Sequence, residues 1–358
     1  MVNNFINKSF WKNKRVFVTG HTGFKGSWLC IFLDLLGAKV TGYSLKPKST
    51  PNLYNQANVK KIIDKSIIAD IRDYKKLYKN IKNSRAEIIF HLAAQPLVRD
   101  SYINPKETFD VNINGTINII ETIRNISKIK SSVIITTDKV YDISKNRIFK
   151  EDDLLGGKDP YSASKVCCEY LFNSYLMSFF KNKKNKKIAT VRAGNVIGGG
   201  DYSKDRLVPD INKSIKNKKK IILRNPNSVR PWQHVLEPLS GYIILAESLY
   251  NKKNDKIDPN WNFGPNISSC KSVRFIAQQF SNNSNSKIKI IKTNNKNHKS
   301  ETDLLRLSNL KSKKYLKWYP KWNLRKTINK IIEWNYEVSK TKKAHKICSQ
   351  QILEYLKD

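Results

Sequence analysis

The chain has 358 residues, of which 39% are hydrophobic and 10% aromatic, enough to bury a sizeable core in one large domain or two closely joined ones. Its 67 lysines and arginines exceed its 29 aspartates and glutamates, for a formal charge of +38. Because this charge is spread along the chain without a nucleic-acid motif, we interpret it as a solvated surface and expect no nucleic-acid partner. Polyanion binding is the alternative, which a salt-sensitive complex with DNA would support.

The cysteines and the N-terminal segment bear on where the protein works. Five cysteines are an odd number, and the sequence contains no C-x-x-C pair, so it predicts neither a disulfide framework nor a zinc site. Met1–Lys14 lacks the apolar core of a signal peptide, and Asp34 interrupts the apolar stretch Trp28–Leu36. We therefore expect a cytoplasmic protein with no membrane association.

Short β-branched runs alternate with amphipathic helical patterns as far as Arg192. The expected strands are Arg15–Thr19, Lys39–Tyr43, Ser66–Ala69, Glu87–Leu92, Ser132–Thr137 and Lys187–Arg192. The expected helices are Ser27–Leu36, Tyr74–Asn83 and Pro105–Ile126. Repeated strand–helix–strand units favour parallel pairing with right-handed crossovers, so we predict an α/β fold with a Rossmann-type doubly wound parallel sheet.

The pattern changes after Arg192. There follow Gly198–Gly200, a strand near Lys220–Arg224, and helices at Leu236–Tyr250, Ser272–Gln279 and Leu324–Val338. We expect a cofactor-binding Rossmann domain over residues 1–192, with a segment of about 232–262 returning to it. Residues 193–358 are expected to form mainly a smaller substrate-binding domain.

The first expected strand leads into a G-x-x-G-x-x-G loop and then a helix. The candidate cofactor contacts in this loop are Gly20, Thr22, Gly23, Phe24, Lys25 and Gly26. Glycines there permit a tight turn and close approach of the backbone to a pyrophosphate, which meets the positive end of the helix, so the loop predicts dinucleotide binding.

The nature of the dinucleotide is less well indicated. The acidic residue expected about 20 residues after the glycines is absent, and Tyr43, Ser44 and Lys46 stand there, which leaves NAD and NADP both open at this point. Asp70 and Ile71 follow the third strand, where a carboxylate can reach an adenine amino group or remain a solvated strand end.

Two groups of residues indicate proton-transfer chemistry. Tyr161 and Lys165 are four residues apart on a helix beginning near Pro160, so the ammonium is expected to lower the pKa of the phenol from about 10; a plain helix surface is the alternative. Thr137, Asp138 and Lys139 lie at the carboxyl edge of the sheet, where parallel sheets bind ligands. Thr137 is placed to hydrogen-bond the substrate oxygen that Tyr161 deprotonates, and Asp138 with Lys139 offers a second acid–base pair. The alternative for this second group is a capped turn with a surface ion pair.

These motifs together resemble the extended short-chain dehydrogenase/reductase family (NAD-dependent epimerases and dehydratases), and within it the CDP-glucose 4,6-dehydratases. The strings that carry the resemblance are Phe10–Trp11, Thr19–Trp28, His91–Arg99, Thr137–Lys139, Asp159–Tyr161, Arg192–Asp201 and Arg230–His234. The dTDP-glucose dehydratases carry a glutamate at the position of Lys139. Val140, Asp142, Ile143 and Tyr202 depart from the usual pattern, which bears on the base and the sugar recognised.

The resemblance implies a hydro-lyase that holds NAD and forms CDP-4-keto-6-deoxyglucose from CDP-glucose, for deoxysugars such as those of lipopolysaccharide O-antigen. In the implied cycle Tyr161 takes the proton of the hydroxyl at carbon 4 as hydride leaves that carbon. Lys139 then takes the proton at carbon 5, Asp138 protonates the departing hydroxyl of carbon 6, and the hydride returns there. Another nucleotide-sugar dehydratase or epimerase, or a non-catalytic dinucleotide-binding protein, remains an alternative.

The resemblance also extends the set of candidate contacts. Ala93 and Ala94 join the cofactor contacts, as do Tyr161 and Lys165. The candidate substrate contacts are Gln95, Arg99, Asn195, Arg206, Arg230 and His234. We expect no metal, because His91 and His234 have no partners at ligand spacing. A homodimer or homotetramer is implied, paired through the helix that begins at Tyr161 and through Pro105–Ile126.

Overall fold

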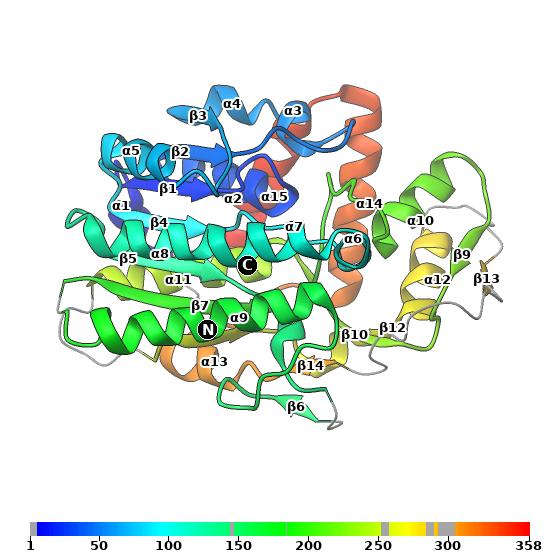
Figure 1. Ribbon diagram of the computed structural model, residues 1–358. Coiled ribbons are helices and arrows are strands. Elements are labelled where there is room, and N and C mark those ends of the chain that lie inside the picture. The colour runs from blue at the N-terminus through cyan, green and yellow to red at the C-terminus, as the bar shows by residue number, and fades with distance from the viewer. Residues whose placement is uncertain (1–5, 144–146, 184, 252–257, 284–289, 293–304) are drawn as a thin grey trace.

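Seven parallel strands form the central sheet of the computed structural model, which describes residues 6–143, 147–183, 185–251, 258–283, 290–292 and 305–358 (Figure 1). In sheet order the strands are β11 (Asn260–Phe263), β7 (Lys187–Ala193), β5 (Ser131–Ile135), β4 (Ile88–His91), β1 (Arg15–Thr19), β2 (Lys39–Ser44) and β3 (Lys65–Ile68). Every neighbouring pair is parallel. The predicted Rossmann-type sheet is confirmed. Of the two predicted domains, residues 1–5, 144–146, 184, 252–257, 284–289 and 293–304 lie outside the described residues.

The central strands of this sheet serve two cores, because successive side chains of a strand point to opposite faces. Val16 and Val18 of β1 belong to one core, and Phe17 between them belongs to the other. The first face is covered by α2 (Phe24–Leu35) and α11 (Leu236–Asn251), with α15 (Ala344–Lys357) packed on α2. The second face is covered by α5 (Tyr74–Ser84), α8 (Gly115–Asn125) and α9 (Pro160–Tyr175). Burial on both faces explains why the strands read as apolar runs.

Two features of this layer differ from the sequence expectation. The helix expected over Pro105–Ile126 is divided into α7 (Pro105–Phe109), a π-helical turn over Asp110–Asn114, and α8. Strand β11, which the sequence pattern did not predict, extends the sheet beside β7. Helix α11 packs against β5, where the Ser131 hydroxyl donates to the Ala246 carbonyl at 2.8 Å. Residues far along the chain thus complete the large sheet and its cover.

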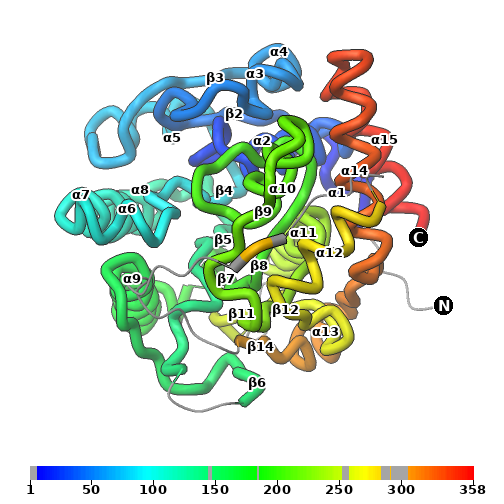
Figure 2. The backbone as a smooth tube through the Cα atoms, turned by 90° about the vertical axis from the view of Figure 1, so that its right-hand side faces the viewer, coloured from blue at the N-terminus to red at the C-terminus, as the bar shows by residue number. Residues whose placement is uncertain are grey.

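A smaller group of elements stands beyond the carboxyl ends of β1 and β2, at the right of Figure 1 and facing the viewer in Figure 2. Its strands are β8 (Asn195–Ile197), β9 (Ile221–Leu223), β10 (Val229–His234), β12 (Cys270–Ser272) and β13 (Ile290–Lys292). Its helices are α10 (Leu207–Lys216), α12 (Val273–Asn283) and α14 (Leu324–Thr341). Helix α14 joins the two parts, because Ile328 and Ile331 lie in the smaller core and Trp334 in the larger. The domain boundaries given above stay a prediction.

The remaining elements are short. They are α1 (Lys8–Trp11), α3 (Leu53–Gln56), α4 (Val59–Ile62), α6 (Val98–Ile103), β6 (Ile148–Phe149), β14 (Arg306–Leu307) and α13 (Leu310–Leu316). None of the helices in the described part of the chain has the length and apolar character that a membrane crossing requires. The described residues also bring together no group of three or more His, Cys, Asp or Glu suited to hold a metal ion.

Candidate active site

The glycine-rich loop connects β1 to the first turn of α2. Gly20 adopts a φ of +77°, a left-handed conformation that favours glycine, and its N–H donates to the Tyr43 carbonyl at 2.9 Å. A Cβ at Gly26 would lie 2.1 Å from the Gly20 carbonyl oxygen, and one at Gly20 would lie 2.8 Å from the backbone nitrogen of Ala93. Only glycines therefore allow the loop to pack this closely against the start of α2 and the end of β4. A loop that binds a pyrophosphate at a helix N-terminus needs such packing.

Substitution of Gly26 by alanine tests this close packing. We expect Gly26→Ala to lower the free energy of unfolding by about 1–3 kcal/mol, the usual cost of forcing an extra methyl group into a filled space. Gly23→Ala is the matched control, because Gly23 is exposed and its added Cβ would lie 3.3 Å from the same carbonyl oxygen. Urea unfolding of both variants measures the change in the free energy of unfolding. Equal stability of Gly26→Ala and the unchanged protein would contradict the close packing at Gly26.

The other candidate cofactor residues surround this loop. The Thr22 hydroxyl bonds the Ser44 hydroxyl at 2.9 Å and donates to the Leu45 carbonyl at 2.8 Å, which ties the loop to the end of β2. Phe24 and Lys25 are half-buried at the start of α2, and Ala93 and Ala94 are half-buried just after β4.

At the end of β3, Asp70 accepts hydrogen bonds from the Arg72 side chain, which is the main reason that the pKa of its carboxyl is lowered. Ile71, the next residue, is buried against Gly115. Asp70 thus stands ionised and partly exposed at the strand end, while Ile71 contributes to packing.

A short 3-10 turn over Asp138–Val140 follows β5 and carries the first set of candidate catalytic side chains. The Thr137 hydroxyl donates to Asp138 Oδ1 at 3.1 Å and accepts from the Lys139 N–H at 3.4 Å. Asp138 is 4% exposed, and its Oδ2 has no hydrogen-bond partner among the described residues. Burial raises the pKa of Asp138, although Lys139, Thr137, Arg230 and Lys25 oppose the rise. The carboxyl is thus biased toward its protonated form, which suits a proton donor.

Helix α9 presents the second set, Tyr161 and Lys165. Its first turn is fixed by Pro160 at the first helical position and by Asp159, whose carboxylate accepts from the Ser162 N–H at 3.0 Å. Burial raises the pKa of Tyr161 to about 12, although a hydrogen bond with Thr137 opposes the rise. The direction is opposite to the one the sequence suggested, because burial disfavours the charged phenolate. The Lys165 ammonium donates to the Ile135 carbonyl at 3.3 Å.

Thr137, Asp138, Lys139 and Tyr161 line one cavity of about 510 Å³ between the large sheet and the smaller part, whereas Lys165 is not part of its described lining. Its described lining also includes Lys25, Arg99, Asn195, Arg206 and Arg230. Arg206 pairs with Asp201 at 3.0 Å, Arg99 pairs with Asp205 at 2.9 Å, and Arg230 is 3% exposed. Burial, with Arg206 next in effect, lowers the pKa of Lys25 to about 8. Such a concentration of cations favours an anionic ligand.

Two candidate substrate residues lie elsewhere. The Gln95 amide donates to the Leu97 carbonyl at 3.1 Å and to the Thr108 hydroxyl at 2.9 Å, and it is not part of the described lining of the cavity. The His234 ring is fully buried, with its centroid 5.9 Å from that of Trp28 and 4.8 Å from that of Trp322. Gln95 therefore shapes the loop after β4, and His234 offers no exposed surface to a substrate.

Sequence reasoning missed Asn112, which lies in the π-helical turn and is 1% exposed. Its side-chain oxygen accepts from the Gln95 N–H at 2.8 Å, and its amide donates to the Ser164 hydroxyl at 2.8 Å. Asn112 thereby connects the loop after β4 to the helix of Tyr161 and Lys165. The only sequence signal was a polar residue on the inner side of an expected helix.

Comparisons with known proteins agree with this arrangement. The family model described as GDP-mannose 4,6 dehydratase matches residues 17–331. The CDP-glucose 4,6-dehydratase of Salmonella typhimurium is 45% identical over 338 residues, which cover 92% of each chain.

Two solved structures share the fold. The UDP-glucose 4-epimerase of Thermotoga maritima with UDP-glucose has a TM-score of 0.79 at 18% identity, covering 91% of this chain and 99% of that one. The dTDP-glucose 4,6-dehydratase of Bacillus anthracis in complex with NAD has a TM-score of 0.75 at 21% identity, covering 92% and 98%.

Proposed function

The chain belongs to the family described as GDP-mannose 4,6 dehydratase, and we propose that it is a hydro-lyase converting CDP-glucose to CDP-4-keto-6-deoxyglucose and water. The observation that carries the proposal is the meeting of Asp138, Lys139 and Tyr161 in one cavity, with the carboxyl biased toward its protonated form. Removal of water needs an acid for the departing hydroxyl, whereas a simple 4-epimerase needs none.

The loop between β1 and α2 fits NAD, because its glycines let it close tightly onto the N-terminus of α2, where a pyrophosphate would approach. Gly20, Gly23 and Gly26 would hold the pyrophosphate, Ala93 and Ala94 would lie along the cofactor, and Asp70 would reach the adenine end. When bound, NAD would supply the hydride-transfer chemistry of the cycle and a cationic nicotinamide ring.

The protein's own residues move the protons. Tyr161 takes the proton of the hydroxyl at carbon 4, with Thr137 hydrogen-bonded to the same oxygen and Lys165 fixed beside β5 by its bond to Ile135. The resulting ketone acidifies carbon 5, from which Lys139 removes a proton. Asp138 then donates its proton to the departing hydroxyl of carbon 6, so that water leaves.

The diphosphate of the substrate would meet the cationic lining of the cavity. Arg230 and Arg206 supply charge-assisted hydrogen bonds, Asn195 a polar anchor, and Arg99 a further cation at the rim. Arg206 and Arg99 already face carboxylates, so they are oriented before a ligand arrives.

We also propose a homodimer as the smallest assembly, through the outer side of α6, α9 and the segment after α9. This side exposes five large apolar side chains: Tyr102, Ile103, Tyr170, Met177 and Phe179. Large apolar side chains exposed on neighbouring elements favour association with another chain. A tetramer and the cytoplasmic location expected from the cysteines stay predictions.

Incubation with CDP-glucose, dTDP-glucose and UDP-glucose, each separately, tests the proposed reaction. We expect CDP-glucose alone to give a product with the alkali-induced absorbance of a 4-keto-6-deoxy sugar and a mass lower by one water. A product of unchanged mass would support a 4-epimerase. No product from any of the three, with NAD bound, would favour a non-catalytic dinucleotide-binding protein.

A further inference from the structure

A buried ion pair lies directly behind the proposed catalytic residues. Arg192 of β7 meets Glu169 of α9 through two parallel contacts, Nε to Oε1 at 2.9 Å and Nη2 to Oε2 at 3.0 Å. The two side chains are 2% and 0% exposed. Because burial of two charges costs desolvation energy, a buried pair is weak evidence for stability, and a role in fixing geometry is the better hypothesis.

The pair contacts the catalytic turn on both of its sides. Glu169 Oε1 accepts from the hydroxyl of Thr136, the residue before Thr137, at 2.5 Å. Arg192 Nη1 donates to the hydroxyl of Tyr141, two residues after Lys139, at 2.8 Å. The segment that carries Asp138 and Lys139 is therefore tied to one bidentate pair at its beginning and at its end.

Tyr141 is itself held from the far side. Its hydroxyl donates to Asn262 Oδ1 at 2.7 Å, and its ring stacks on Phe149 with centroids 5.0 Å apart. The Asn262 N–H in turn donates to Glu151 Oε1 at 2.9 Å. Three chain segments thus fix the position of the tyrosine hydroxyl.

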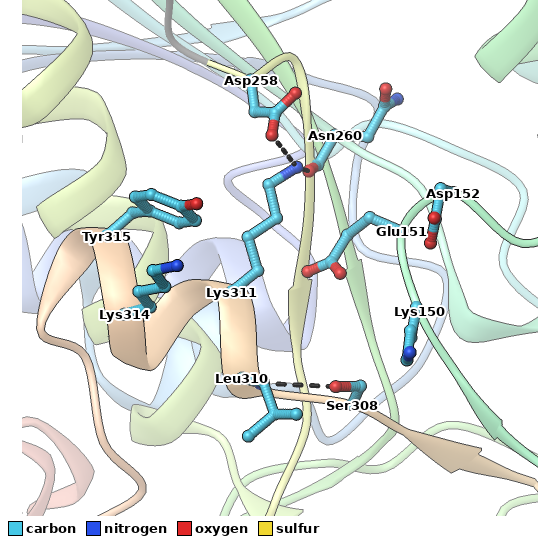
Figure 3. Close-up of a pocket in the computed structure, with 10 residues that line it drawn as sticks. All are labelled: Lys150, Glu151, Asp152, Asp258, Asn260, Ser308, Leu310, Lys311, Lys314 and Tyr315. Atoms are coloured by element: carbon cyan, nitrogen blue, oxygen red, sulfur yellow. Dashed lines mark hydrogen bonds and ion pairs between the residues drawn. The ribbon is translucent and has the colours of Figure 1, made fainter.

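The outer end of this network reaches a second cavity, of about 480 Å³, which shares no described lining residue with the first (Figure 3). Glu151 and Asn260 line it, and Asn260 also donates to Glu169 Oε2 at 3.1 Å. In Figure 3, Lys311 extends from α13 to the strand, where it pairs with Asp258 at 3.0 Å and donates to the Asn260 carbonyl at 2.6 Å. The network is therefore anchored at the edge of the sheet, away from the reacting groups.

The negative charge of Glu169 also acts on Lys165, which lies on the same helix as the proposed base Tyr161. Although burial opposes its ionisation, Arg192 holds the pKa of Glu169 below its ordinary value. Lys165, one helical turn earlier, has its pKa lowered by burial, and the Cys168 and Glu169 side chains oppose that change. Glu169 thus favours the charged form of Lys165 while its Oε1 accepts the hydrogen bond from Thr136.

We propose that the Glu169–Arg192 pair positions Asp138 and Lys139 for the elimination of water, acting through Thr136 and Tyr141. The inference rests on the proposed function, and it assigns Glu169, Arg192 and Tyr141, which lie outside the described lining of the catalytic cavity, as positioning residues. Thr136, which is part of that lining, holds the beginning of the turn. It predicts that loosening the turn slows the loss of water more than the oxidation at carbon 4, because Tyr161 is held separately by α9.

Tyr141→Phe is the first test, since it deletes the hydroxyl and keeps the stacked ring. We expect kcat to fall about 10- to 100-fold with KM for CDP-glucose changed less than about threefold, because misplacement of a reacting group by about 1 Å costs rate rather than binding. Since oxidation at carbon 4 continues, the absorbance of reduced nicotinamide should rise during turnover.

Two further variants separate positioning from stability. Thr136→Val should reproduce the fall in kcat and the accumulation of reduced cofactor, and Thr136→Ser, which keeps the hydroxyl, should restore both. Tyr355→Phe is the matched control: this buried tyrosine donates to buried Glu237 at 2.7 Å, in the core around α15, and its loss should lower thermal stability without changing kcat.

The outcomes are distinct. The inference would be overturned if Tyr141→Phe and Thr136→Val kept the wild-type kcat. It would also be overturned if they slowed the oxidation at carbon 4 and the loss of water equally. Either result would leave the proposed function intact. A wild-type protein that turns over none of the three nucleotide sugars would overturn the proposed function and the inference with it.

Discussion

Tyr161→Phe should reduce kcat on CDP-glucose by roughly 10²- to 10⁴-fold, the range typical for loss of a positioned acid or base. The phenol is the group placed to take the proton from the hydroxyl at carbon 4, and a phenyl ring cannot. Because oxidation at that carbon is the first step, reduced nicotinamide should not accumulate in this variant. Rapid-mixing absorbance in a single turnover, with NAD bound, measures this directly.

The raised pKa of Tyr161, about 12, does not weaken the prediction. Burial favours the protonated phenol, which cannot accept a second proton, so Tyr161 must first lose its own proton to serve as the base, and a phenyl ring can never do so. Tyr170→Phe is the matched control, since Tyr170 lies on the same helix but is 60% exposed. A Tyr161→Phe variant that keeps more than about a tenth of wild-type kcat would remove Tyr161 from its role as base.

The parallel sheet could be predicted because its signal is local. Val16, Phe17 and Val18 are all apolar, and such runs are typical of strands buried on both faces. Strand β11 could not be predicted in the same way: Asn260–Phe263 includes two asparagines, and its place is set by pairing with β7 and by bonds to Glu169 and Glu151. The π-helical turn around Asn112 is likewise fixed by partners distant in sequence.

In the candidate active site, too, some features could be predicted from local sequence and others depend on contacts between distant residues. The sequence was enough to predict that Thr137, Asp138 and Lys139 lie at the edge of the sheet and act on one substrate with Tyr161 of the following helix. The structure places these four residues in one cavity. Their protonation was not predictable, because burial of Tyr161 outweighs its neighbours. Glu169 and Arg192 gave no signal, since a charged residue on a helix and one in a strand become partners only when the fold brings them together.

Asp138→Asn separates the elimination from the oxidation. An amide cannot supply a proton to the departing hydroxyl, so we expect kcat to fall by roughly 10²- to 10³-fold while carbon 4 is still oxidised. Reduced nicotinamide and a bound 4-keto sugar should therefore accumulate, the opposite of the result for Tyr161→Phe. Mass spectrometry of the quenched complex distinguishes the 4-keto sugar before and after loss of water.

The pH dependence gives an independent reading of the same carboxyl. Asp138 acts only when protonated, and burial raises its pKa, so its contribution persists at low and moderate pH and is lost as pH rises through that raised pKa. This alkaline fall in kcat should be absent from the residual rate of Asp138→Asn and present in Asp64→Asn, which removes an exposed carboxylate. If Asp138→Asn lost water at the wild-type rate, the proton would have to come from another group in the cavity, and Lys25, with a pKa lowered to about 8, would be the next to substitute.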